Sequence, residues 1–160
     1  HNVKKYFEII EKLKFQRPDI ALSSDFIVGF PGEEDEDFDQ TMQFVDQVKF
    51  VIAYSFMYSS RPGTPAANLE QINLNVKKAR LNALQTLLKE QQKFYNETFV
   101  NKIIEVFFDR KGRHENQYIG RSIYNQSVFI ESKKNLIGSI LQVSIKRSTG
   151  FALEASLNEQ

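Results

Sequence analysis

At 160 residues, the chain can form one or two small domains, and a hydrophobic content of 41% is sufficient for a core. No run of residues reaches the ~18 apolar positions of a membrane span. Cysteine is absent from the sequence, which excludes disulfides, thiolate metal sites and a cysteine nucleophile. Because the chain begins at His1 and enters directly into an amphipathic helix, we expect it to be a fragment of a longer protein.

The charge is unevenly distributed along the chain. Residues 1–72 hold 7 Lys/Arg and 12 Asp/Glu, a net charge of −5, whereas residues 73–160 hold 14 Lys/Arg and 8 Asp/Glu, a net charge of +6. The basic half is where a polyanion would dock, and a solvated basic surface would explain the charge equally well.

The first third of the chain alternates helical and extended patterns. Apolar residues recur at helical spacing in residues 2–15, which predicts an amphipathic helix. Residues 20–30 are predicted to form a strand buried on both faces, as in a parallel sheet. The next helix begins in the acidic run 33–37, where the carboxylates are stabilised by the positive end of the helix dipole. We prefer that interpretation to a metal site.

The remainder of the chain divides into two patterns. A strand at 50–58, a loop over 59–72 and a long helix over 75–99 complete a second strand-to-loop unit, typical of a parallel α/β barrel whose loops form the working surface. Short strands separated by Gly or Asn then predict a small antiparallel barrel of OB-like size. These five strands are expected at 103–109, 117–123, 128–132, 139–147 and 151–157. We place the boundary near residue 95.

Two loops carry the most specific motifs. Residues 24–33 read SDFIVGFPGE and are followed by Asp37 and Phe38, a pattern that resembles the radical S-adenosylmethionine (SAM) methylthiotransferases. Residues 58–67 read YSSRPGTPAA and resemble the tRNA branch of that family, the MiaB type. The sister branch, which modifies a ribosomal protein, typically has Glu-Glu-Gly-Thr in this loop, so Arg61 and Pro62 favour the tRNA branch.

The resemblance covers essentially the whole chain and implies an α/β fold. Residues 1–94 resemble the C-terminal part of a parallel (β/α) radical SAM partial TIM barrel. Residues 95–160 resemble the TRAM domain, a small antiparallel, OB-like β-barrel that binds RNA. The segment 120–122, Asn125 and the pairs 128–129 and 137–138 match the TRAM pattern. Departures occur at Glu34, at Asn101 and at 155–156, where the family commonly has Thr, Gly and Gly-Glu.

The family adds a methylthio group to an isopentenylated adenosine beside the tRNA anticodon. The resemblance implies SAM and two [4Fe-4S] clusters as cofactors, one of which cleaves SAM reductively to a radical. The cluster cysteines would lie upstream of His1, so we expect no metal ligand, no catalytic residue and no independent activity in this chain. The expected partners are the tRNA anticodon stem-loop and the missing N-terminal part, with no membrane, in the cytoplasm.

The resemblance also suggests the residues that contact the cofactor. The end of the first strand and its loop correspond to the segment that lies against the adenine of SAM, where an apolar wall and backbone amides are needed. Arg61 follows the next strand and could hold a phosphate or the carboxylate of the cofactor. Ile27 could equally be barrel core, and Arg61 could equally stabilise its loop. The predicted cofactor residues are Ile27, Gly29, Phe30, Pro31, Gly32 and Arg61.

In the barrel, cations interleaved with aromatic residues fit single-stranded or loop RNA. Tyr118, Tyr124 and Phe129 offer flat faces, but Phe129 is expected in the core between Val128 and Ile130, so Tyr124 is preferred. The predicted RNA-binding residues are Arg121, Tyr124, Lys133, Lys134, Lys146 and Arg147.

Two alternatives remain open from the sequence. One is the ribosomal-protein methylthiotransferase of the same family. The other is a stand-alone RNA-binding module or an inactive remnant of a split gene, for which a partial barrel would expose sheet edges and apolar helix faces.

Overall fold

The computed structural model describes residues 3–158. Contacts divide the chain into two compact units between Gln91 and Gln92. His1 and Asn2, the latter the first residue of the helix expected at 2–15, lie outside the described residues. None of the helices within residues 3–158 combines the length and the apolar character needed to cross a membrane.

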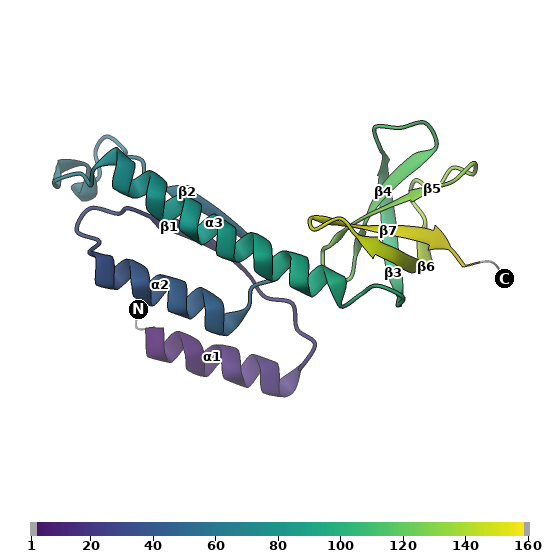
Figure 1. Cartoon of the computed structure of the whole chain (residues 1–160), viewed down its shortest axis with the longest axis horizontal. Coiled ribbons are helices and arrows are strands. Elements are labelled where there is room, and N and C mark those ends of the chain that lie inside the picture. The colour runs from purple at the N-terminus through teal and green to yellow at the C-terminus, as the bar shows by residue number, and fades with distance from the viewer. Residues whose placement is uncertain (1–2, 159–160) are drawn as a thin grey trace. The chain divides into compact units, whose positions relative to one another are not determined.

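The first unit alternates helices with two strands, as the periodicity predicts. The loop expected over residues 59–72 contains a short 3-10 helix, η1. The elements are α1 (Val3–Gln16), β1 (Ser23–Val28), α2 (Asp35–Val48), β2 (Ile52–Met57), η1 (Pro65–Asn68) and α3 (Leu74–Glu97); Figure 1 labels all of them except η1.

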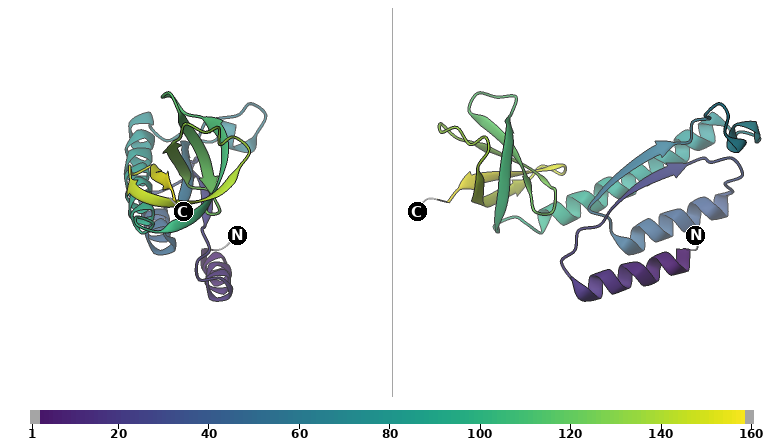
Figure 2. Two further views of the ribbon diagram at one scale, coloured as in Figure 1. Left: turned by 90° about the vertical axis from the view of Figure 1, so that its right-hand side faces the viewer. Right: turned by 180° about the vertical axis from the view of Figure 1, so that it is seen from behind.

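The two strands pair in parallel, as predicted, and the helices α2 and α3 lie along them (Figures 1 and 2). The core of this unit combines Val28 from β1, Val45 from α2 and Leu84 from α3, all of which are fully buried. Helix α1 contacts α2 through the rings of Phe7 and Phe44, whose centroids are 5.0 Å apart. The sheet is therefore covered on one side by helices.

The prediction that the first strand is buried on both faces is wrong. Ile27 is 62% exposed, and Tyr54 and Phe56 on β2 are exposed as well, whereas Val28 is buried and Phe26 packs against the core. Successive side chains of a strand point to opposite faces of the sheet, and helices of the described residues cover only one face. The interpretation of Ile27 as core is therefore excluded for this chain.

The second unit is a closed barrel of five strands in the order β3-β4-β5-β7-β6, with β6 pairing back onto β3 (Figure 2). The expectation of an antiparallel barrel is corrected at one pair, because β5 and β7 run parallel. Strands in a closed barrel cannot all alternate in direction when their number is odd, so one parallel pair is required. The strands are β3 (Ile103–Lys111), β4 (Gln117–Ser122), β5 (Ser127–Glu131), β6 (Ile140–Ser148) and β7 (Ala152–Leu157).

Strand alternation decides which side chains fill the barrel. On β5, Val128 and Ile130 are fully buried, whereas Phe129 is only half-buried and lies outside the core cluster. The expectation that Phe129 is core is therefore wrong. Gly120 on β4 permits close approach of β3, because a Cβ there would lie 2.4 Å from the carbonyl oxygen of Phe107.

Candidate functional site

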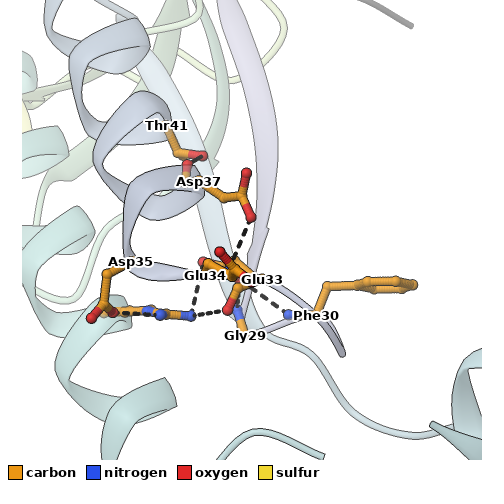
Figure 3. Close-up of polar contacts among 8 residues, drawn as sticks. Gly29, Phe30, Glu33, Glu34, Asp35, Asp37 and Thr41 are labelled. Atoms are coloured by element: carbon orange, nitrogen blue, oxygen red, sulfur yellow. Dashed lines mark hydrogen bonds and ion pairs between the residues drawn. The ribbon is translucent and has the colours of Figure 1, made fainter. Parts of the chain in front are cut away.

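The loop that follows β1 folds back onto the carboxylate of Glu33 (Figure 3). The backbone N–H groups of Gly29 and Phe30 both donate hydrogen bonds to Glu33 Oε2, the second at 3.1 Å. The N–H of Glu33 in turn donates to the carbonyl of Phe30 at 2.9 Å. Gly29 and Gly32 adopt φ angles of 74° and 88°, a region that glycine tolerates without strain. The loop conformation is thus held by interactions within the chain.

A buried cation from α3 holds the same carboxylate. The guanidinium of Arg80 lies 3.5 Å from Glu33 Oε1, donates to the carbonyl of Glu33 at 3.0 Å and donates to Asp35 Oδ1 at 2.7 Å. The side chains of Arg80 and Glu33 are 8% and 13% exposed, whereas that of Asp35 is 95% exposed. The pair with Glu33 is shielded from water, so it contributes more stabilisation than the solvated pair with Asp35.

The two sequence motifs meet because parallel strands end at the same edge of the sheet. The N–H of Tyr58 donates to the carbonyl of Val28 at 2.8 Å, and the ring centroids of Phe30 and Tyr58 are 5.0 Å apart. Lys77 from α3 contacts Tyr58, with its Nζ 5.9 Å from the ring centroid and 3.5 Å from the carbonyl oxygen. A Cβ on Gly29 would lie 2.4 Å from Lys77 Cγ, which leaves no space for a larger residue.

The predicted cofactor residues fall into different environments. Ile27, Phe30, Gly32 and Arg61 are exposed, whereas Gly29 and Pro31 are buried. Figure 3 shows the Phe30 ring pointing away from the polar contacts of the loop. The residue is 48% exposed, and its ring packs against that of Tyr58. The guanidinium of Arg61 makes no hydrogen bond or ion pair within residues 3–158. An apolar wall is present, but the amides of Gly29 and Phe30 are already occupied by Glu33.

The carboxylates of the acidic run stabilise the start of α2, as the sequence predicts. Asp35, Glu36 and Asp37 occupy the first turn, and the N–H of Glu34 donates to Asp37 Oδ2 at 3.0 Å (Figure 3). Carboxylates at this position satisfy unpaired N–H groups and complement the helix dipole. Across the described part of the chain, no group of three or more His, Asp or Glu side chains is arranged to hold a metal ion.

The cations predicted to contact RNA lie on the surface of the barrel unit, but they are not equivalent. Arg121 Nη1 donates to the carbonyl of Asn125 at 3.1 Å, which fixes its position without neutralising it. Arg147 Nε lies 2.5 Å from Glu154 Oε2, so its charge is partly neutralised. The exposed cations are Arg121, Lys133, Lys134, Lys146 and Arg147.

The aromatic candidates of the barrel are engaged in packing. Tyr118 is buried within the core. Tyr124 packs against the core, with ring centroids 5.5 Å from Phe99 and 6.5 Å from Tyr95. Only part of the Tyr124 ring can therefore face a nucleotide.

Sequence reasoning missed a buried polar network at the end of α3. Asn96 is 1% exposed; its Nδ2 donates to the carbonyl of Gly150 at 2.9 Å, and its Oδ1 accepts from Gln126 Nε2 at 2.9 Å. Gln126 Oε1 accepts from Ser122 Oγ at 3.0 Å. No periodic signal marks Asn96, because its partners lie 30 and 54 residues away in sequence.

The buried cation Arg80 was missed as well, although a signal exists for it. It shares a helix face with Leu84 and Leu88, spaced four residues apart, both of which are buried. An arginine on the apolar face of a helix requires a partner, and Glu33 supplies it.

Comparisons with known proteins agree with the sequence motifs. Residues 97–157 match the TRAM domain. The chain is 50% identical over 151 residues to tRNA-2-methylthio-N(6)-dimethylallyladenosine synthase of Rickettsia akari (strain Hartford), covering 93% of this chain. Proteins of that name from Orientia tsutsugamushi (strain Ikeda) and Agrobacterium fabrum (strain C58 / ATCC 33970) are 46% and 49% identical over 96% and 91% of the chain. The chain spans about a third of the length of these relatives: 34%, 34% and 32%.

Proposed function

We propose that the chain is part of an enzyme that adds a methylthio group to a dimethylallyl-modified adenosine of tRNA. The resemblance of the chain to the tRNA methylthiotransferase family is confirmed over more than nine tenths of the chain's length. The observation that carries the proposal is the 46–50% identity to relatives named for that product. Their names refer to tRNA, so the ribosomal-protein branch is not favoured.

In this proposal the first unit is the last part of a radical SAM barrel and lines the cofactor. SAM and the iron–sulfur clusters supply the radical chemistry, and the clusters require thiolate ligands that a chain without cysteine cannot provide. The exposed faces of Ile27 and Phe30 fit the flat, apolar adenine. Glu33 and Arg80 hold the conformation of the loop after β1. Arg61, whose guanidinium is unpaired within residues 3–158, is the cation that binds a carboxylate or a phosphate in this proposal.

The second unit is proposed to bind the anticodon stem-loop of tRNA. The exposed cations of the barrel would contact phosphates, and Arg121 is the best placed because Asn125 already holds its guanidinium. Lys133 and Lys134 lie in the loop between β5 and β6, so both side chains are accessible.

A chimera tests the enzymatic part of the proposal. The corresponding third of the Agrobacterium fabrum relative is replaced by this chain, and nucleosides of the tRNA from cells that depend on the chimera are analysed by mass spectrometry. We expect the methylthio nucleoside to appear. A soluble chimera that carries its clusters and leaves the tRNA unmodified would contradict the proposal.

A charge reversal tests the RNA part. Changing Arg121 and Lys134 to Glu in the 160-residue chain should weaken binding of an anticodon stem-loop and flatten the dependence of affinity on salt concentration, because fewer counterions are released. Lys12→Glu on α1 is the matched control, since it changes an exposed charge in the other unit. Unchanged affinity and slope in the double variant would remove the barrel from RNA binding.

A further inference from the structure

One outward-facing position of the barrel carries an aromatic side chain that neither the sequence analysis nor the comparisons assign. On β3, Val106 and Phe108 are fully buried, whereas Phe107 between them is 46% exposed. Strand register places Phe107 opposite Arg121 on β4 and opposite Ile140 on β6. Directly paired residues on one face have Cβ atoms about 4.5–5.5 Å apart, so the side chains of Arg121, Phe107 and Ile140 form a row across β4, β3 and β6.

The frame around this row is rigid. Strand β3 is paired on both edges, by β4 and by β6. Arg121 Nη1 is held by the carbonyl of Asn125, and the following turn is closed by the hydrogen bond from the N–H of Asn125 to the carbonyl of Ser122 at 2.9 Å. Because the platform is ordered before binding, a ligand loses little free energy to immobilising it.

The chemistry of the row favours an unpaired nucleobase over other occupants. An exposed aromatic face stacks on any base, and an adjacent guanidinium contacts the phosphate that accompanies it. A paired duplex hides its base faces and would use only the cation. Arg121 adds a cation to the row, whereas on β3 itself the flanking exposed residues are Glu105 and Asp109, the latter paired with Arg110 at 3.0 Å. The phosphate of a bound nucleotide is therefore expected on the β4 side of Phe107.

We propose that Phe107 is a stacking platform for an unpaired RNA base and that Arg121 binds a neighbouring phosphate. This inference rests on the proposed function, in which the barrel binds the loop of a tRNA. It adds which strand face meets the bases and predicts a preference for unpaired over paired RNA.

The test uses the 160-residue chain and two fluorescein-labelled probes, a short unstructured RNA of mixed sequence and a fully paired, blunt-ended RNA duplex. Phe107→Ala should weaken binding of the unstructured probe about tenfold to a hundredfold, because stacking on one base is lost. Phe107→Leu, which keeps apolar volume, should weaken it similarly, and Phe107→Tyr should bind as the unmodified chain does. The control is Phe94→Ala, which removes a 72% exposed ring from α3 and should have no effect.

The dependence of RNA affinity on salt concentration distinguishes the role of Phe107 from that of Arg121. Phe107→Ala should leave the slope of log affinity against log salt unchanged, whereas Arg121→Gln should reduce it by about one. Melting temperatures of the variants verify that each is folded.

The possible outcomes are distinct. If the unmodified chain binds the unstructured probe and either Phe107→Ala or Phe107→Leu binds equally well, the stacking inference is overturned and the proposed function stands. Equal affinity of the unmodified chain for the paired duplex also overturns the inference. Failure of the unmodified chain to bind the unstructured probe overturns the inference as well, and the RNA-binding part of the proposed function is then decided by the anticodon stem-loop measurement.

Discussion

Replacing Arg80 by Met tests whether the buried ion pair holds the loop after β1. Met keeps most of the apolar stem of the side chain, so the change removes mainly the charge. The substitution deletes the contacts with the Glu33 carboxylate and carbonyl and the contact with Asp35. It leaves the Glu33 carboxylate, whose side chain is 13% exposed, without a cation.

The expected loss follows from these contacts. Removing one partner of a buried ion pair costs about 3–5 kcal/mol when the other charge is left uncompensated. Glu33 retains two backbone N–H donors, and the exposed pair with Asp35 contributes at most about 1 kcal/mol, so the expected decrease in the free energy of unfolding is about 2–3 kcal/mol. Asp35→Asn, which removes only the exposed pair, should cost less than about 1 kcal/mol.

Urea denaturation followed by far-UV circular dichroism measures this loss, because the helices lie mostly in the first unit. The double variant Glu33→Gln with Arg80→Met should be more stable than Arg80→Met alone, since Gln is neutral and its carbonyl still accepts from Gly29 and Phe30. A free energy of unfolding for Arg80→Met within about 0.5 kcal/mol of the unmodified chain would refute the argument.

Two further substitutions test the loop and the barrel network. Gly29→Ala should lower the melting temperature more than Gly32→Ala, because both have positive φ but only Gly29 has Lys77 Cγ 2.4 Å from the added Cβ; equal melting temperatures would contradict this steric explanation. Asn96→Ala should destabilise the chain by about 2–3 kcal/mol in urea denaturation and speed amide exchange around Gly150, because buried polar groups lose their partners. Unchanged exchange at the Gly150 turn would contradict the role of Asn96.

Local patterns in the sequence determined the elements and their order. Helical periodicity in α1 and α2, the acidic first turn of α2 and the short strands of the barrel are properties of neighbouring residues, and all appear as predicted. The motifs at 24–33 and 58–67 carry the family resemblance because their residues are contiguous. The pairing of these two loops also followed, since parallel strands end at one edge of a sheet.

Only the tertiary structure decided which faces and partners these residues have. Ile27 is exposed because helices cover one face of a two-stranded sheet, which its apolar neighbours could not reveal. Phe107 and Phe108 are adjacent and identical, and register alone places the first outward and the second in the core. Arg80 meets Glu33 across 47 residues; its place on the apolar face of α3 signals a buried cation, but only helix packing decides which carboxylate is its partner.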